Sequence, residues 1–197
     1  MLVLENRYIG KVRAGHGDSV FLMPGQLYVG RGVASVRTLL GSCVAITLWH
    51  PVTRHAAMCH FLLPDRARPR DGARDGRYGD EALEQIVEAI RHVGADPGEY
   101  HAQVYGGADT LPYRQPIGTS NAVRQKVGER NVEKAWMLVE QYAFRLDSVD
   151  VGGNEPRLVL LDAGTGLVEL RRAGEQRRDA GRTAPAAKAR SIAGVTS

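Results

Sequence analysis

Two apolar segments separated by a short polar turn constrain the fold of this chain more than any other feature. Residues 43–49 and 57–63 are rich in β-branched and aromatic side chains, a composition typical of β-strands. The residues between them include His50-Pro51-Val52-Thr53, which favours a turn. Together they predict an antiparallel hairpin. Because an isolated hairpin is at best marginally stable in water, further strands or a helix must pack against it.

A turn centred on Pro51 and Val52 would fix the register of this hairpin. In that register Cys43 lies directly opposite His60 on one face of the sheet, and opposed Cβ atoms are about 4.5–5.5 Å apart. Cys59 then points to the other face, among core residues. The faces depend on this register, because a slip of one residue would turn every side chain to the opposite side.

The residues before Cys43 suit a nucleophile. A thiol becomes reactive where a base or backbone N–H groups favour its anion, and His60 would supply the base. Gly41 permits a tight turn, so that N–H groups near Ser42 and Cys43 could converge on a developing oxyanion. The alternative is structural: Cys43 as a small buried hydrophobic residue and His60 as a core histidine.

Six segments match, in order, the motifs of one known family. They are Arg37-Thr38-Leu39-Leu40-Gly41-Ser42-Cys43-Val44-Ala45, Met58-Cys59-His60-Phe61-Leu62-Leu63-Pro64, Arg77-Tyr78-Gly79-Asp80-Glu81-Ala82-Leu83, Val104-Tyr105-Gly106-Gly107-Ala108, Val127-Gly128-Glu129-Arg130-Asn131 and Asp150-Val151-Gly152-Gly153. On these segments, over about residues 1–170, the chain resembles CheD, the chemoreceptor glutamine deamidase family of bacterial and archaeal chemotaxis.

This resemblance implies a reaction and assigns roles to particular residues. CheD proteins hydrolyse the side-chain amide of certain glutamines on the helical cytoplasmic region of methyl-accepting chemotaxis receptors, giving glutamates. Carried over, Cys43 is the nucleophile that forms a thioester and His60 is the general base. A hydroxyl residue upstream orients the histidine in the family; Thr38 is the best match, and Ser35 is the alternative. No metal or organic cofactor is expected.

The resemblance also implies partners. Receptor helices are the expected substrate, and a CheC-type phosphatase is a further partner, so a non-catalytic regulatory role is the alternative function. Nucleic-acid binding is not expected, because the basic C-terminal segment lacks aromatic residues on which bases stack. Membrane insertion is not expected either, since no apolar stretch has the length of a span or a signal peptide. With two cysteines and no disulfide framework, we expect a cytoplasmic protein.

Two other kinds of cysteine site fit the sequence less well. A zinc site built from Cys43, Cys59, His60 and His50 or His55 would lack the paired ligand spacing of such sites. Cys59 and His60 are also adjacent, so they would point to opposite faces of a strand. A papain-type protease would carry its cysteine at the start of a helix, whereas Cys43 opens a strand.

Composition and charge predict one domain and a tail. A chain of 197 residues with 43% hydrophobic and 24% charged residues suits a single globular domain, predicted over residues 1–170. Residues 171–197 hold seven basic and two acidic residues and almost no large apolar ones, so they are predicted to be disordered. The net charge of +4 therefore comes from the tail, which leaves about −1 for the domain.

The remaining pattern predicts helices and further strands. Asp80 is the expected cap of a helix ending at Gly94, and a second helix is expected from near Ser120 to Ala143. Strands are expected at residues 103–105, 146–151, 157–161 and 167–170, joined by glycine turns. This predicts a mixed α+β fold with largely antiparallel strands, and the resemblance implies a β-sandwich-like core flanked by helices.

Two further segments could border the site. Gly106 and Gly107 follow a predicted strand; they either form an ordinary turn or let another backbone or a substrate approach closely. Between residues 65 and 77, Arg66 and four further arginines alternate with aspartates and glycines. This segment is either a solvated linker or a substrate-facing flap.

Overall fold

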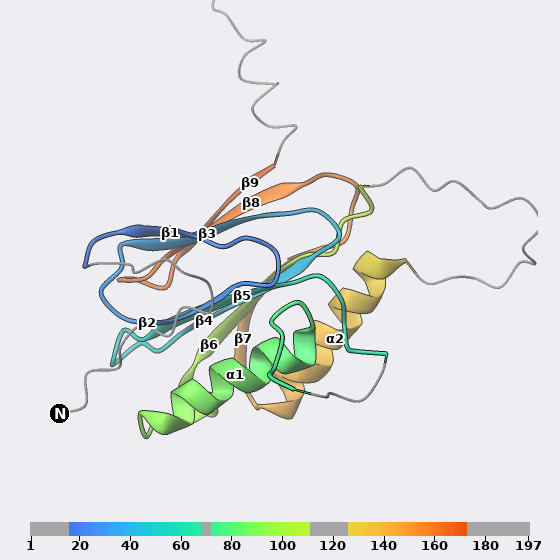
Figure 1. Ribbon diagram of the computed structural model, residues 1–197. Coiled ribbons are helices and arrows are strands. Elements are labelled where there is room, and N and C mark those ends of the chain that lie inside the picture. The colour runs from blue at the N-terminus through green and yellow to red at the C-terminus, as the bar shows by residue number, and fades with distance from the viewer. Residues whose placement is uncertain (1–15, 68–71, 111–125, 173–197) are drawn as a thin grey trace, which may run out of the picture.

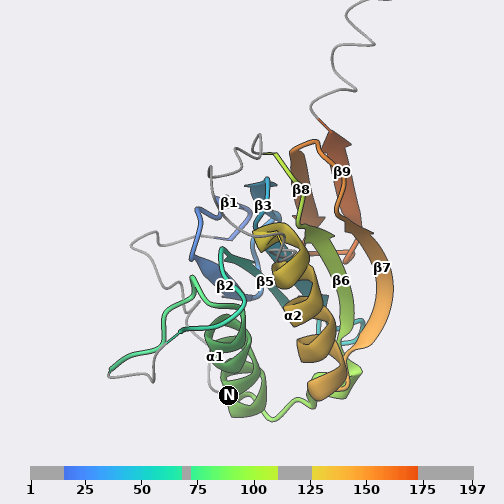
Figure 2. The same ribbon diagram turned by 90° about the vertical axis from the view of Figure 1, so that its right-hand side faces the viewer.

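The chain forms three layers (Figure 1). The computed structural model describes residues 16–67, 72–110 and 126–172. Within them a four-stranded sheet packs on a five-stranded sheet, and two helices cover the outer face of the larger sheet (Figures 1 and 2). The predicted α+β class with a sandwich-like core is confirmed, and both helices lie on the same side.

The strand bounds define the two sheets. The smaller sheet has the order β1-β3-β8-β9, with β1 (Ser19–Phe21), β3 (Ser35–Leu40), β8 (Arg157–Asp162) and β9 (Val168–Arg172). The larger has the order β2-β5-β4-β6-β7, with β2 (Leu27–Gly30), β5 (Ala56–Phe61), β4 (Val44–Trp49), β6 (His101–Gly106) and β7 (Arg145–Val151). Neighbouring strands are antiparallel except for β1 with β3 and β6 with β7. The helices are α1 (Gly79–His92), the 3₁₀ turn η1 (Pro97–Glu99) and α2 (Val127–Gln141).

Each boundary between layers has its own apolar core. Residues such as Tyr28, Met58 and Val159 fill the space between the sheets, while residues such as Ile46 and Leu83 pack between the larger sheet and the helices. Strand β4 is covered on both faces and is buried along nearly its whole length, whereas buried and half-buried residues alternate along β8. A two-sided environment therefore explains the continuous apolar run in β4.

The predicted hairpin forms between β4 and β5, but the predicted register was wrong: the observed pairing is displaced by two residues. Ala45, not Cys43, pairs with His60. Four residues rather than two connect the paired His50 and His55, and the last of them, Arg54, adopts a left-handed φ of 53°. Because the displacement is two residues and not one, every side chain keeps its predicted face.

The helix prediction was partly correct. α1 ends as expected, with Gly94 in the left-handed region at φ 76°. Its N-cap is Tyr78, however, and Asp80 lies within the first turn, where its carboxylate accepts a hydrogen bond from the N–H of Glu81. α2 begins at Val127 rather than near residue 120, and residues 111–125 lie outside the described part of the chain.

The connections between strands differ from the expected hairpins. The Gly152-Gly153 turn follows β7 in the larger sheet and leads to β8 in the smaller, so the chain changes sheets there. Residues 41–43 make the opposite change, from β3 to β4, and β1, β2 and β3 were not predicted. Strand β9 reaches Arg172, two residues into the predicted tail, and residues 173–197 lie outside the described part.

Gly166 allows the turn before β9 to pack on Trp49, and replacing it should destabilise the fold. Its φ is 76°, and an added Cβ would lie 2.6 Å from Cε3 of the indole. We expect Gly166→Ala to lower the free energy of unfolding by about 1–3 kcal/mol through strain and overpacking. Gly98→Ala is the control, since its Cβ would meet nothing closer than 3.5 Å. Equal urea midpoints for Gly166→Ala and wild type would contradict this expectation.

Candidate active site

Three of the predicted site residues meet at the interface between the two sheets. Thr38 lies on β3 of the smaller sheet, His60 on β5 of the larger, and Cys43 directly precedes β4. Thr38 Oγ1 is 2.7 Å from His60 Nδ1, so this hydrogen bond joins the sheets. The alternative, Ser35, bonds instead to the hydroxyl of Ser19 at 2.8 Å. The geometry therefore favours Thr38 as the residue that orients the histidine.

The hydrogen bonds of Thr38 fix which nitrogen of His60 carries the proton. The Thr38 hydroxyl donates its one hydrogen to the carbonyl of Leu22 at 2.8 Å. Its oxygen must then accept from Nδ1–H of His60, which leaves Nε2 unprotonated. His60 is only 2% exposed, and Nε2 has no hydrogen-bond partner within the described part of the chain. The site thus holds a basic nitrogen that is oriented and free to accept a proton.

Cys43 shares a face with His60 but is not its direct partner. Ala45 pairs with His60, and Cys43 precedes Ala45 by two residues, in the position of a diagonal neighbour just outside β4; it packs against the apolar cluster between the sheets. Such Cα atoms lie about 7–8 Å apart, with the Cβ atoms somewhat closer. The described structure has no hydrogen bond between the Cys43 thiol and Nε2. The prediction of directly opposed residues was wrong, although the shared face is confirmed; catalytic contacts often tighten only when substrate binds.

Burial keeps both groups neutral in the resting protein. It lowers the pKa of His60 to about 4, an effect that the Leu22 carbonyl partly opposes. It also raises the pKa of the Cys43 thiol, with partial opposition from the residue's own backbone N–H. At neutral pH the pair is therefore a thiol and an imidazole, and the proton must move as the sulfur attacks.

Residues 41–43, the nucleophile loop, are held by all three of their carbonyl groups. The carbonyl of Gly41 accepts from Ala108 N at 2.8 Å and that of Cys43 from Gly107 N at 2.8 Å. The carbonyl of Ser42 accepts from Asn131 Nδ2 at 3.0 Å. In a trans peptide the N–H points away from the carbonyl. The N–H groups of Ser42 and Cys43 therefore point away from the donors that bind the Gly41 and Ser42 carbonyls.

Gly106 and Gly107 allow other segments of the backbone to approach closely, and they do not form an ordinary turn. A Cβ on Gly106 would collide with the carbonyl oxygen of Cys43, and its φ is 116°. A Cβ on Gly107, at φ 68°, would lie 3.0 Å from the carbonyl oxygen of Gly128 in the first turn of α2. Both glycines thus border the site through backbone packing, and contact with substrate stays a prediction.

Asn131 is a site residue that sequence reasoning missed. It is fully buried on α2, and besides Ser42 its Nδ2 donates to the carbonyl of Leu62 at 2.8 Å. Leu62 lies two residues beyond His60, so one amide links the nucleophile loop to the strand that carries the base. The available signal was a polar residue on the buried helix face that also holds Ala135 and Leu138.

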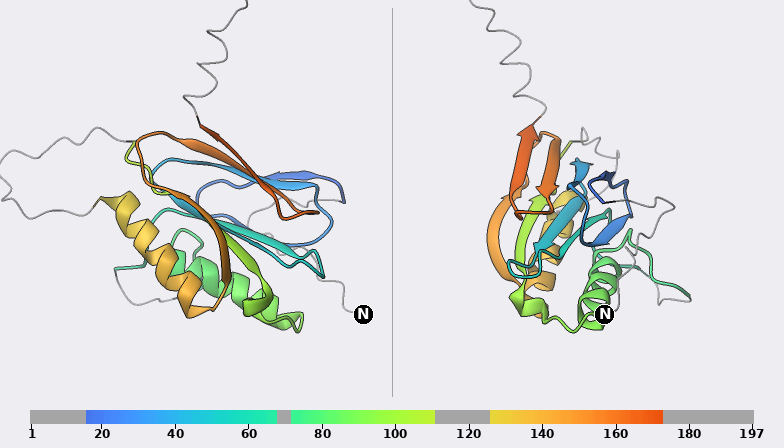
Figure 3. Two further views of the ribbon diagram at one scale, coloured as in Figure 1. Left: turned by 180° about the vertical axis from the view of Figure 1, so that it is seen from behind. Right: turned by 90° about the vertical axis from the view of Figure 1, so that its left-hand side faces the viewer.

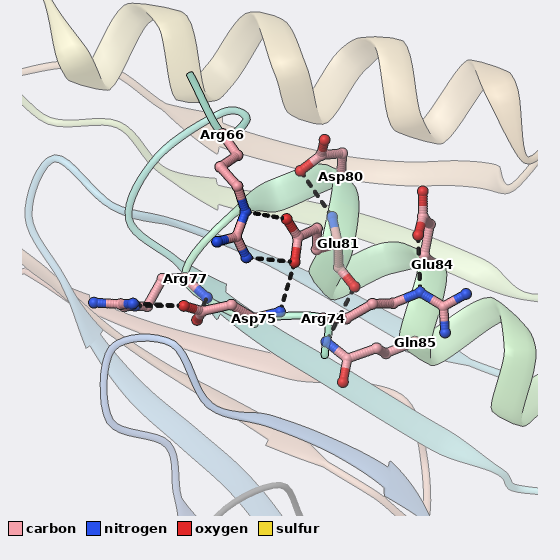
Figure 4. A network of polar contacts seen from close by, with 8 residues as sticks. All are labelled: Arg66, Arg74, Asp75, Arg77, Asp80, Glu81, Glu84 and Gln85. Atoms are coloured by element: carbon pink, nitrogen blue, oxygen red, sulfur yellow. Dashed lines mark hydrogen bonds and ion pairs between the residues drawn. The ribbon is translucent and has the colours of Figure 1, made fainter. Parts of the chain in front are cut away.

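The arginine-rich loop between β5 and α1 is anchored by Glu81 (Figure 4). The Glu81 carboxylate, nearly buried, accepts from Arg66 at 2.7 and 3.0 Å and from the N–H of Asp75 at 2.6 Å. Arg74 pairs with acidic residues of the same helix. The described part of this loop is therefore tethered, residues 68–71 lie outside it, and a role as a substrate-facing flap stays a prediction.

Within the described ranges there is no group of three or more His, Cys, Asp or Glu side chains that could hold a metal ion. Both cysteines are free, and Cys59 is buried among apolar side chains, which raises the pKa of its thiol to about 12. Neither described helix has the length and apolar character needed to cross a membrane.

The chain is similar to known proteins over most of its length. A family model described as CheD chemotactic sensory transduction matches residues 62–172. The probable chemoreceptor glutamine deamidase CheD 1 of Chromobacterium violaceum is 40% identical over 159 residues, covering 81% of this chain and 80% of the relative. CheD 3 of Dechloromonas aromatica is 40% identical over 151 residues, covering 77% and 85%. The crystal structure of the Bacillus licheniformis hypothetical protein YfiH shares a TM-score of 0.37 and 12% identity over 60% of this chain and 48% of that one, a likeness too low to establish a common fold.

The buried histidines should make stability depend on pH. Burial lowers the pKa of His55 and His60 to about 4, so between pH 4 and 6.5 the unfolded chain binds protons that the folded chain does not. The free energy of unfolding should therefore fall as pH drops through this window, with a slope of up to about 2.7 kcal/mol per pH unit. In His60→Gln the slope should be about half as steep, and in His92→Gln, an exposed control, unchanged. Denaturant unfolding at several pH values measures this slope. Equal slopes in His60→Gln and wild type would refute the lowered pKa of His60.

Proposed function

The chain belongs to the CheD family, and we propose that it hydrolyses glutamine side-chain amides of chemotaxis receptors to glutamate, using Cys43 and His60. One observation carries the proposal. The Thr38–His60 hydrogen bond leaves an unprotonated Nε2 on the same inter-sheet face as the half-buried thiol. A base and a nucleophile so placed suit hydrolysis of an amide through a covalent intermediate. The name of the curated relatives supports the receptor glutamine as substrate.

The first half of the reaction starts from the neutral pair. A rotation of the Cys43 side chain brings Sγ to Nε2 of His60, which takes the thiol proton as the sulfur attacks the carboxamide carbon. The carbonyl π electrons move to the oxygen, where the N–H groups of Ser42 and Cys43 stabilise the negative charge. The imidazolium then protonates the amide nitrogen. Ammonia leaves, and the glutamyl group remains on Cys43 as a thioester.

The second half uses the same groups in reverse roles. His60, neutral again, takes a proton from a water molecule that attacks the thioester carbon. The tetrahedral intermediate expels the sulfur, which recovers its proton from the imidazolium, and glutamate is released. Because burial makes the imidazolium a strong acid, with a pKa of about 4, it gives up its proton readily in both halves.

The supporting residues act on the geometry of these steps. Thr38 keeps Nδ1–H occupied, so that Nε2 stays the acceptor. Gly41 and Ser42 carry the peptide groups that set the oxyanion site, and Gly106 and Gly107 permit the backbone packing behind it. Because the proposed substrate is a cytoplasmic segment of a receptor, the protein would act in the cytoplasm.

A CheC-type phosphatase as a second partner follows from family resemblance alone. If binding such a partner were the main role, the site could be idle. The two functions differ in one measurable product, because a protein that only binds leaves every receptor glutamine unchanged.

Removing the thiol should abolish the reaction. Cys43→Ala, incubated with a receptor cytoplasmic fragment, should convert no glutamine to glutamate by mass spectrometry and should release no ammonia. Cys59→Ala is the matched control: Cys59 is buried on the other face of β5, so this variant should keep wild-type turnover at some cost in stability.

Hydroxylamine offers a check on the covalent intermediate. It should attack the thioester, giving a glutamyl hydroxamate on the receptor and free Cys43 thiol. Wild-type protein that yields glutamate but never the hydroxamate would argue against the acyl-enzyme, and undiminished turnover in Cys43→Ala would exclude Cys43 as nucleophile.

We expect activity to require the hydroxyl group of Thr38 and not merely the volume of its side chain. Thr38→Val keeps the volume but removes the acceptor for Nδ1–H, so His60 loses its fixed tautomer and orientation. We expect kcat to fall about 10²-fold, while Thr38→Ser should restore most of it. ¹⁵N chemical shifts of the His60 ring should show a protonated Nδ1 in wild type and Thr38→Ser and a mixture of tautomers in Thr38→Val. Equal kcat for all three proteins would contradict this role.

A further inference from the structure

Two of the connections that pass from one sheet to the other are linked by hydrogen bonds through a short segment of the chain. The nucleophile loop leads from β3 to β4, and residues 152–156 lead from β7 back to β8. The views in Figure 3 show β8 and β9 stacked above β6 and β7. Between the two crossings runs a short segment, Gly106–Asp109, which we call the strap. Its backbone groups form hydrogen bonds to both crossings.

The strap is bonded to the crossings through consecutive backbone groups. On one side, the N–H groups of Gly107 and Ala108 donate to the carbonyls of the nucleophile loop, each at 2.8 Å. On the other side, Gly152 N donates to the Gly106 carbonyl at 2.8 Å, and Asp109 N donates to the Gly153 carbonyl at 2.7 Å. A displacement of the Gly152-Gly153 turn would therefore be transmitted to the peptide groups next to the nucleophile.

A buried arginine holds that turn in place. Arg157, 3% exposed at the start of β8, donates from Nη1 to the Asp150 carbonyl and carboxylate at 2.5 Å each, and from Nη2 to the Gly152 carbonyl. Its backbone pairs with Leu40, the residue directly before the nucleophile loop. The guanidinium presents these donors from two nitrogens in a fixed plane, whereas a lysine ammonium has one nitrogen and cannot reproduce this geometry.

We propose that Arg157 is a positioning residue of the deamidation site, acting through the Gly152-Gly153 turn and the strap on the peptide groups of the nucleophile loop. The inference rests on the proposed function. Arg157 does not contact the thiol or the imidazole, so it affects the oxyanion site and leaves the Cys43–His60 pair unchanged. This separates two chemistries of the same sulfur: attack on an amide, which forms an oxyanion, and alkylation by iodoacetamide, which forms none.

The test compares Arg157→Lys with the wild-type full-length chain. In the variant we expect kcat for receptor glutamine to fall at least about 10-fold, since small misplacements of reacting groups have effects of this order, with KM changed by less than about 2-fold. The rate of Cys43 alkylation should stay within about 2-fold. Hydrogen exchange at the amides of Gly107 and Ala108 should become at least about 10-fold faster.

The control is Arg172→Gln, which removes the exposed arginine that binds the other oxygen of Asp150. It should leave turnover, alkylation and the two exchange rates within about 2-fold of wild type. Should Arg157→Lys not fold, Asp150→Asn weakens the same anchor and should speed exchange at the same two amides.

The possible outcomes separate this inference from the proposed function. If wild type shows no deamidation, the proposed function fails, and the exchange rates still decide whether Arg157 holds the strap. Unchanged exchange at Gly107 and Ala108 overturns the inference. So does a parallel loss of turnover, alkylation and folded protein in Arg157→Lys, which would show a purely structural role, or an equal effect of Arg172→Gln.

Discussion

One hydrogen bond between the sheets, from His60 Nδ1 to Thr38 Oγ1, is the interaction on which the site depends. Burying a polar group in an apolar core costs free energy unless the group is hydrogen-bonded. This contact satisfies Thr38 and Nδ1 of His60, with the Leu22 carbonyl accepting the hydroxyl hydrogen. Nε2 of the same ring has no partner in the described structure. The sandwich thus holds Nδ1 of the imidazole in a hydrogen bond and leaves Nε2 without one, and this asymmetry is what the proposed role of His60 as general base requires.

Close backbone packing provides the second constraint. Three layers of main chain meet beside Cys43: the nucleophile loop, the strap, and the first turn of α2 at Gly128. Glycine is required where carbonyl oxygens approach so closely, because any Cβ would collide. One turn further along α2, Asn131 reaches both the nucleophile loop and the end of β5. The helix therefore covers the core and also fixes the distance between the nucleophile and base.

Features set by local sequence were predictable, and features set by contacts between distant segments were not. The strands β4 and β5, the face of each cysteine, and the end of α1 at Gly94 follow from patterns within a few residues. The hairpin register did not, because it depended on the left-handed conformation of Arg54 in a four-residue turn. Tertiary packing also determines three features that the sequence did not predict. They are the crossings between the sheets, the strands β1 to β3 and the hydrogen bonds of Asn131. Thr38 could be named only by family resemblance, since nothing local links it to a histidine 22 residues away.

A neutral resting pair has a consequence for selectivity. Where a cysteine is a thiolate at rest, it reacts with any accessible electrophile. Here burial opposes charge on both Cys43 and His60, so in the mechanism that we propose the sulfur becomes nucleophilic only as its proton moves to Nε2. That transfer becomes favourable when negative charge can pass onward to a carbonyl oxygen held by the N–H groups of the nucleophile loop. In this mechanism a substrate that does not place its carboxamide at these N–H groups does not make the proton transfer favourable. The position of the nucleophile loop, more than the acidity of the thiol, would then decide which amides react.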